Sequence, residues 1–361
     1  MTVSQFRIEV PDDVLDDLRT RLRDTRFTTS PRNRPWEGGT DPAYLKDLVT
    51  YWADEFDFRT QEARLNRLDH FKAPVLGRDL HFVHMRGTGP APMPLLLCHG
   101  WPSSFVEMLP LAALLTDPKR PGDSFDVVIP SMPGFLYSDL PAEPLTRAAM
   151  ARVLHSLMTD TLGYERYGAF GGDIGGAAVG WLGALYPDQV AGIHLIHPPA
   201  PASLDDPPLT PEEQAFLDAE AAYDQRDGGY SEIMLTRPDT IAAALIDSPA
   251  GLAAWIVDKL RDWSDCHGDL ESRFDRDTLL TVLTLYWATG SIGTSFQSYY
   301  DWHLNTPRPP ITVPAAVTLS HEPSMAALPR SFAERALTDL RHWHEPRKGG
   351  HFMPLEEPAQ L

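Results

Sequence analysis

This 361-residue sequence has little cysteine, no excess of basic residues and no long apolar stretch at its start. Its two cysteines, Cys98 and Cys266, give no disulfide framework, so a reducing cytoplasm is the default compartment. Lys and Arg number 31 against 50 Asp and Glu, a formal net charge of −19 that disfavours nucleic acid and anionic membrane surfaces as partners. Residues 1–10 lack the apolar run of a signal peptide or membrane anchor. We therefore expect a cytoplasmic protein without nucleic-acid or membrane partners, and the sequence leaves open whether it forms a homodimer.

The hydrophobic content of 43% and charged content of 22% are typical of a soluble globular protein. The length allows a large core, in one domain with an insertion or in two domains. Apolar runs that read as strands alternate with helical segments such as 146–162, which predicts an α/β fold with a mostly parallel sheet and helices on both faces. The expected strands are 80–84, 94–98, 125–130, 167–170 and 190–196.

The pattern divides the chain into four parts. Residues 1–75 are expected to be a helical lead-in packed on the core, and residues 76–204 the first part of the sheet domain. Residues 205–306 are helical throughout, with starts at Thr210-Pro211 and Ser248-Pro249 and further helices over 277–289 and 291–300. We expect this part to be an inserted helical lid. Residues 307–361 return to the core, with a strand over 311–319.

The turn Gly171-Gly172-Asp173-Ile174-Gly175 lies between a short apolar strand and a helix rich in small residues. Strand, tight glycine turn and helix form the nucleophile elbow of an α/β-hydrolase. The central residue is Asp173, which is ionised at neutral pH and attacks carbon to form an ester, as in opening an epoxide or displacing a halide. A glycine-rich turn followed by an acid is also common in ordinary loops, and that alternative stays open on the turn alone.

Two further motifs fit the same chemistry. His99-Gly100-Trp101-Pro102 follows a predicted strand, and its Trp101 backbone N–H with that of Ile174 could form an oxyanion hole. His351, preceded by Gly349-Gly350 near the C-terminus, has the position of the base in the order nucleophile, acid, histidine. His-Gly-x-Pro can also be a simple turn, and most of the 13 histidines are expected to be structural or solvated.

Neither a metal ion nor a cofactor is expected. The segment Arg341-His342-Trp343-His344-Glu345 is rich in histidine, but no second cluster completes a ligand set. Asp265-Cys266-His267 is expected to be solvated surface.

The chain resembles the microsomal-type epoxide hydrolase family of α/β-hydrolases nearly from end to end. The resemblance rests on the N-terminal phrases 6–11 and 24–27, on the motifs at 99–102 and 171–173, and on the phrases 236–240, 247–255 and 285–292. It implies two tyrosines that hold and protonate the epoxide oxygen, which map to Tyr230 and Tyr299, with Tyr300 and Tyr223 as stand-ins. It also implies a further short helix after Pro358, close to the end of this sequence.

The third member of the triad departs from the family pattern. The resemblance places an acid at Ser324, five residues before Pro329-Arg330, and a serine cannot stabilise a protonated histidine. Glu322 lies on the same loop and could reach in with its longer side chain. Either Glu322 replaces the usual acid, or another carboxylate does, or hydrolysis of the ester is weak.

The sequence thus predicts a hydrolase that opens a bulky apolar small-molecule epoxide to a vicinal diol. Asp173, His351, Glu322, Tyr230 and Tyr299 are the candidate catalytic residues, and Trp101 with the two tyrosines would contact substrate. A haloalkane dehalogenase-like hydrolase, which needs halide-binding N–H donors instead of paired phenols, is one alternative. A catalytically impaired binding protein on the same fold, suggested by Ser324, is the other.

Overall fold

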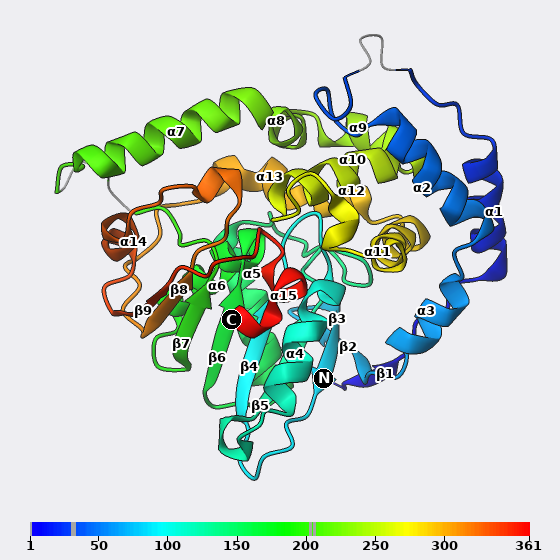
Figure 1. The fold of residues 1–361 in the computed structure, drawn as a ribbon. Helices are drawn as coiled ribbons and strands as arrows, with labels where there is room; N and C mark the ends of the chain where they lie inside the picture. Colours follow the sequence, from blue (N-terminus) through cyan, green and yellow to red (C-terminus); the bar gives the residue numbers. More distant parts are fainter. Residues whose placement is uncertain (1, 30–33, 202–203, 205–206) are drawn as a thin grey trace.

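The computed structural model describes residues 2–29, 34–201, 204 and 207–361, and within these residues the strands form one nine-stranded sheet (Figure 1). Its order is β1-β2-β3-β5-β4-β6-β7-β8-β9. Along this order, the pairs from β1 to β3 and the pair β3–β5 are antiparallel, and every later pair, from β5–β4 to β8–β9, is parallel. The strands are β1 (Ser4–Phe6), β2 (His70–Val75), β3 (Arg78–Met85), β4 (Met93–Cys98), β5 (Phe125–Pro130), β6 (Tyr167–Gly171), β7 (Val190–Leu195), β8 (Ala315–Thr318) and β9 (Leu340–His344).

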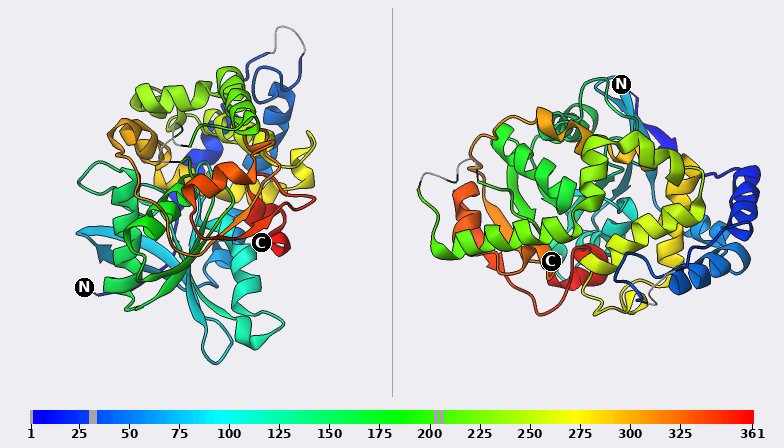
Figure 2. Two further views of the ribbon diagram at one scale, coloured as in Figure 1. Left: turned by 90° about the vertical axis from the view of Figure 1, so that its left-hand side faces the viewer. Right: turned by 90° about the horizontal axis from the view of Figure 1, so that it is seen from above.

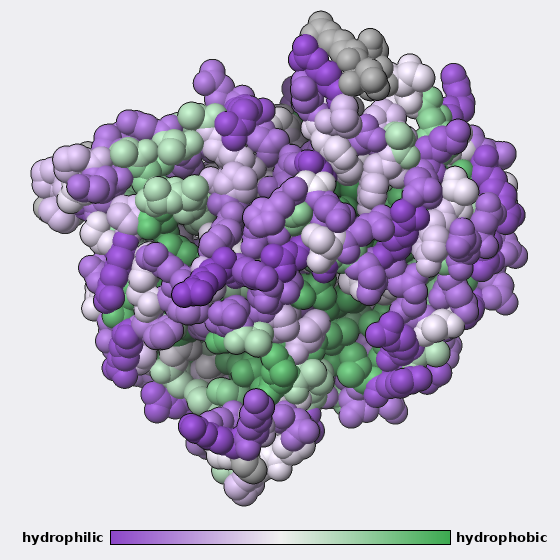
Figure 3. Space-filling view, viewed as in Figure 1, coloured by the Kyte–Doolittle hydropathy of each residue, from purple (hydrophilic) through white to green (hydrophobic). Residues whose placement is uncertain are grey.

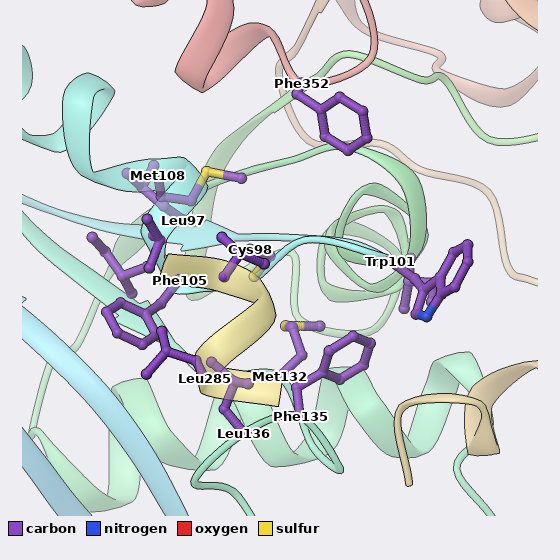
Figure 4. Packing of buried hydrophobic residues seen from close by; sticks show 14 of the residues in the cluster. Leu97, Cys98, Trp101, Phe105, Met108, Met132, Phe135, Leu136, Leu285 and Phe352 are labelled. Atoms are coloured by element: carbon purple, nitrogen blue, oxygen red, sulfur yellow. The ribbon is translucent and has the colours of Figure 1, made fainter. Parts of the chain in front are cut away.

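The middle of the sheet is buried on both faces. α4 (Leu109–Thr116) and α15 (Met353–Glu356) lie on one face, and α5 (Arg147–Ser156) and α6 (Asp173–Leu185) lie on the other (Figure 2). Every residue of β6 is buried, as expected for a strand that helices cover from both sides. Figure 4 shows Leu97, Cys98, Phe105 and Met108 within this core.

A block of helices over residues 211–304, called here the helical block, lies above the carboxyl ends of the parallel strands (Figure 1). Thr210 starts it with a capping box, in which the Thr210 side chain and Glu213 satisfy each other's backbone N–H groups. The boundary expected at 204–205 falls beside residues 205–206, which lie outside the described part. The helices are α7 (Pro211–Asp227), α8 (Gly229–Thr236), α9 (Pro238–Leu245), α10 (Pro249–Trp263), α11 (Arg276–Thr289), α12 (Ile292–Ser295) and α13 (Gln297–Tyr300).

The N-terminal segment packs on the helical block and also extends the sheet. Its helices α1 (Asp12–Arg23), α2 (Pro42–Asp54) and α3 (Phe58–Leu65) contact α10 and α11. The Trp52 Nε1–H donates to Thr284 Oγ1 at 3.0 Å, and Thr40 Oγ1 donates to Ala254 O at 2.7 Å. The expectation of a purely helical lead-in was wrong in one respect, because β1 and β2 form the antiparallel edge of the sheet.

Two other expectations need correction. The strand expected over 311–319 is limited to β8, because Pro314 has no N–H to donate and pairing starts after it; Ile311 makes only an isolated bridge to Leu337. The single helix expected over 291–300 is two short helices. Around Phe296 two backbone hydrogen bonds span three residues, as in a 3₁₀ turn, instead of the four of an α-helix. Phe296 N donates to Gly293 O, and Tyr299 N donates to Phe296 O. After β8 come α14 (Arg330–Ala336), β9 and α15.

No single helix in the described residues is both long and apolar enough to cross a membrane, although α9 and α10 pass that test as a pair bent by 119°. The surface in the view of Figure 3 is mostly hydrophilic, with a hydrophobic area around α4.

Candidate active site

Asp173 lies at the turn between β6 and α6, where its φ of +51° is strained for a residue other than glycine. Two glycines, Gly175 and Gly100, let the nucleophile turn and the segment after β4 approach each other closely. A Cβ on Gly175 would lie 2.3 Å from Cys98 O, and a Cβ on Gly100 would lie 2.4 Å from Asp173 Oδ1. The turn therefore holds the Asp173 carboxylate out at the carboxyl edge of the sheet.

The Trp101 backbone N–H donates to Asp173 Oδ1 at 2.9 Å. Ile174 directly follows Asp173 and lines the same cavity. The Trp101 side chain differs from expectation, because it is fully buried and does not line the cavity. Its ring stacks on Tyr230 with centroids 5.5 Å apart, so it packs against that tyrosine.

His351 Nδ1 hydrogen-bonds to Glu322 Oε2, the contact expected from the sequence. The loop that carries His351 is fixed by its backbone: His351 N donates to Trp263 O at 2.8 Å, and Gly349 N to Asp265 Oδ2 at 3.1 Å. Asp265 is thus buried and structural, which corrects the expectation that 265–267 is solvated surface; of those residues only His267 is exposed.

Glu322 is buried and receives donors at both carboxylate oxygens. The Ser324 hydroxyl donates to Oε1, while Oε2 faces His351 and, at 3.2 Å, His197 Nε2. Burial by itself raises the pKa of the Glu322 carboxyl, but His197 and His351 together hold it well below its usual range. Ser324 therefore acts as a hydrogen-bond donor to the acid rather than in place of it.

The pKa of His351 is shifted in the opposite direction, upward. Burial lowers the pKa of His351, yet the negative charges of Glu322 and then Asp173 outweigh burial and raise the pKa to about 9. A change in the charge of Asp173 would consequently change the basicity of His351.

His197 is a site residue that the sequence analysis missed. The Asp173 backbone N–H donates to His197 Nδ1 at 2.8 Å, so Nδ1 carries a lone pair and the neutral ring has its hydrogen on Nε2, toward Glu322. His197 thereby joins the nucleophile turn to the acid. Its position two residues after β7 was the available signal, because residues just beyond the carboxyl ends of parallel strands meet at one edge.

His197, Glu322 and His351 are also the described residues whose ligand atoms come close enough to hold a metal ion, within 4.8 Å of one another. The hydrogen bonds already given use these atoms, since Glu322 touches both rings and His197 Nδ1 faces a backbone N–H. Hydrogen bonding between the three side chains therefore accounts for the cluster.

Tyr230 on α8 and Tyr299 on α13 face the site from the helical block, with ring centroids 6.4 Å apart. Burial, and after it the charge of Asp173, raises the pKa of both phenols, so that each keeps its proton. Of the two stand-ins, Tyr223 donates a hydrogen bond from its hydroxyl to Asp227 Oδ2 at 2.8 Å, and Tyr300 is exposed. The pair at Tyr230 and Tyr299 is thus the one that lies near Asp173.

A cavity of about 580 Å³ lies between the helical block and the sheet. Its wall contains most of the expected site residues and, in addition, further aromatic and charged side chains. The wall includes Arg147, Asp173, Ile174, Trp181, His197, Glu220, Tyr223, Asp224, Tyr230, Trp263, Tyr299, Trp302, Arg308, Glu322, Ser324 and His351.

Two family models match this chain, over ranges that overlap at residues 93–108. Residues 3–108 match the family model of the epoxide hydrolase N terminus, and residues 93–228 match that of the alpha/beta hydrolase fold. Epoxide hydrolase 1 of Sus scrofa is 32% identical over all of this chain and 87% of its own length. Juvenile hormone epoxide hydrolase 2 of Ctenocephalides felis is 33% identical over 99% of this chain and 83% of its own. The crystal structure of juvenile hormone epoxide hydrolase from Bombyx mori superimposes with a TM-score of 0.89 at 27% identity, covering 99% and 91% of the two chains.

Proposed function

Since this chain belongs to the epoxide hydrolase family of α/β-hydrolases, we propose that it opens a small-molecule epoxide to a vicinal diol through a covalent ester on Asp173. The family and the fold expected from the sequence are confirmed by these relatives, and the chain is a hydrolase. The ester, the diol and the roles of single residues are the proposal, and the site geometry supports it.

In the first step the Asp173 carboxylate attacks a carbon of the epoxide ring. The carbon–oxygen bond breaks, its electron pair stays on the oxygen, and a phenol of Tyr230 or Tyr299 gives that oxygen its proton. A phenol with a raised pKa is a weak acid, so proton transfer accompanies bond breaking, and the phenolate is readily reprotonated.

In the second step His351 takes a proton from water, and the hydroxide attacks the ester carbonyl carbon. The N–H groups of Trp101 and Ile174 stabilise the oxyanion, and Glu322 stabilises the protonated ring. The acyl carbon–oxygen bond breaks, and the released alkoxide takes the proton from His351. Asp173 is left as a carboxylic acid that releases its proton to solvent, which balances the proton that the phenolate takes up from solvent after the first step and restores the starting enzyme.

The observation that carries this proposal is the placement of two protonated phenols opposite a carboxylate nucleophile in one cavity. Paired phenols stabilise a departing oxygen, whereas a departing halide needs N–H donors, so the geometry favours an epoxide over a haloalkane. Measurement of halide release from a haloalkane tests that alternative. The aromatic wall of Tyr230, Trp263 and Trp302 suits a bulky apolar substrate body, with the helical block as its lid.

Isotope transfer in a single turnover tests the ester directly. With excess enzyme and an aryl epoxide in ¹⁸O-water, the diol should contain no ¹⁸O, because its new oxygen comes from Asp173, and the peptide with Asp173 should gain one ¹⁸O. His351→Gln should form the ester and accumulate it, since loss of a general base slows hydrolysis roughly 10²- to 10⁴-fold. Label in the first-turnover diol would mean direct attack by water, and no diol from any epoxide would support the binding-protein alternative.

A further inference from the structure

Arg147 is a buried cation in the wall of the cavity, and among the described residues no carboxylate pairs with it. It is the first residue of α5 and is 7% exposed. Its Nη1 donates to Ser298 O at the long distance of 3.3 Å, and its Nε is buried without a partner. A guanidinium has five N–H donors, so most of its hydrogen-bonding capacity is unused in a site where that is costly.

The local fold does not require this side chain. The contact that fixes the start of α5 is made by the Arg147 backbone, whose N–H donates to Asn305 Oδ1 at 2.8 Å, and most residues could supply that N–H. The adjacent carboxylate of Asp301 is already bound, since its Oδ2 accepts from Leu145 N at 2.7 Å and Gln297 Nε2 at 2.9 Å. Among the described residues Arg147 therefore has no carboxylate partner that would offset the burial of its charge.

The guanidinium lies in the cavity wall beside an aromatic ring. Its Cζ lies over the Trp302 ring, 4.9 Å from the centroid, and this contact uses none of its N–H groups as hydrogen-bond donors. Ser298, which accepts its one side-chain bond, directly precedes Tyr299, and the positive charge of Arg147 acts against the raised pKa of the Tyr299 phenol. The free donors are thus close to the phenol proposed to hold the epoxide oxygen.

The other charges in the wall restrict the position of an anion. Glu220 and Asp224 lie on α7, and Asp173 is the nucleophile. Arg308 donates to the backbone oxygens of Pro309 and Ala200. An anionic group of a ligand would be repelled by α7 and attracted to Arg147, where a carboxylate matches the planar N–H fork of the guanidinium.

We propose that Arg147 binds a carboxylate that the substrate carries next to its epoxide ring, so that the enzyme's substrates are epoxy acids with an apolar body. This inference rests on the proposed epoxide hydrolysis and specifies its substrate class. Trp263 and Tyr230 contact the apolar body, and Arg147 fixes which end of the substrate faces Tyr299.

Kinetics on a matched pair of substrates test this assignment. We expect kcat/KM for 3-phenylglycidate to exceed that for its methyl ester at least tenfold in the wild-type enzyme. In Arg147→Met, which keeps the apolar stem, the preference for the acid should disappear or reverse. The kcat/KM for the acid should fall, and the kcat/KM for the ester should not. Arg147→Lys, which keeps the charge without the fork, should lie between the two.

Arg152→Met is the matched control, because Arg152 lies on the same helix, is half-exposed and pairs with Glu143 at 3.0 Å. It should keep the wild-type preference. Removing a buried cation that lacks a carboxylate should leave the unfolding midpoint of Arg147→Met unchanged or raised, whereas a structural arginine would lower it. An equal or better rate on the ester in the wild type, an unchanged preference in Arg147→Met, or a faster rate on an epoxide bearing an amine overturns the proposal.

A binding measurement separates this inference from the reaction itself. Calorimetry with 3-phenylpropionate and its methyl ester should show tighter binding of the acid to wild-type enzyme and no such difference in Arg147→Met. If no epoxide is hydrolysed but the acid still binds through Arg147, the proposed function fails and the carboxylate site stands. If the acid and the ester bind equally, the carboxylate site is wrong whatever the enzyme does with epoxides.

Discussion

At the scale of single residues, the site is organised around one buried carboxylate with several donors. Glu322 holds His351, His197 and the Ser324 hydroxyl, so a single acid positions the base and is itself fixed by two neighbours. Truncating a member of such a network leaves buried polar atoms unpaired, and the effects of separate mutations are not additive.

The pH dependence of ester hydrolysis follows from the charges around His351. The ring must be neutral to take a proton, and in the free enzyme its pKa is raised to about 9. Ester formation removes the charge of Asp173, which is one of the causes of that rise. The rate of ester hydrolysis should therefore increase with pH to a plateau, and the midpoint of the increase should lie below 9. Glu322→Gln removes the larger electrostatic cause and should shift the midpoint further down, with a lower plateau. Rapid quenching across a series of buffers measures both midpoints, and identical midpoints in the two enzymes would contradict this prediction.

Substitution of His197 should separate its role from that of a packing residue. His197→Phe keeps an aromatic ring but leaves the Asp173 N–H unpaired and removes a donor to Glu322. Hydrolysis of the ester should slow roughly 10- to 100-fold, the equivalent of one hydrogen bond to a charged group at about 1.5–3 kcal/mol. His194→Phe, on β7 but bonded to Thr318 Oγ1, is the control and should keep the rate of hydrolysis. Equal losses in both variants would assign His197 to packing.

At the scale of elements, the carboxyl ends of the parallel strands supply the residues that the reaction needs. The segments after β4, β6, β7 and β8 carry Trp101, Asp173, His197 and Glu322, and His351 follows β9. They meet because parallel strands in one sheet end at one edge. The close contact between the nucleophile turn and the end of β4 fixes their relative positions.

Two glycines on α6 should respond very differently to alanine. In Gly175→Ala the new Cβ would lie 2.3 Å from Cys98 O and 2.6 Å from His99 O, and backbone atoms at the end of a central strand cannot move cheaply. We expect a loss of about 1–3 kcal/mol in the free energy of unfolding, with activity lost in the protein that still folds. Gly180→Ala meets nothing closer than 3.5 Å and should be neutral or stabilising. Denaturant unfolding compares them, and equal stability of the two variants would refute the clash.

At the scale of the whole molecule, the N-terminal segment holds the helical block in place over the sheet. Arg21 pairs with Asp247 and Arg276 with Asp47, while Trp52 reaches Thr284 inside the interface. The helical block carries both tyrosines and the sheet carries Asp173, His351 and Glu322. The first step of the proposed reaction therefore depends on how these two parts fit together.

Weakening this interface should affect the two half-reactions unequally. Trp52→Phe leaves the fully buried Thr284 hydroxyl unpaired, which should cost about 1–3 kcal/mol of stability and slow ester formation more than ester hydrolysis. Adding Thr284→Val removes the second polar partner and should restore much of the stability. Denaturant unfolding and rapid-quench measurement of both steps provide the comparison. A uniform loss in both steps would show that the tyrosines do not depend on this contact.

The sequence by itself determined the fold, the family and the residues with a local signature. The glycines around Asp173, the turn at Trp101 and the glycines before His351 are short-range patterns, because tight turns restrict which residues fit them. Glu322 could be named as well, since its loop was already located by the distance to Pro329. The strand pairs of the N-terminal edge escaped detection because short strands of mixed polarity have no clear period.

Only the tertiary structure decided which side chains meet. His197 has only its position after a strand as a sequence signal and Arg147 only its position at a helix start, and both positions are ordinary until their neighbours are known. Their importance comes from contacts across 24 residues to Asp173 and across 151 residues to Ser298. Burial, and the presence or absence of a partner for a buried polar atom, are properties of the packed chain, so they become visible only when distant segments come together at the same edge of the sheet.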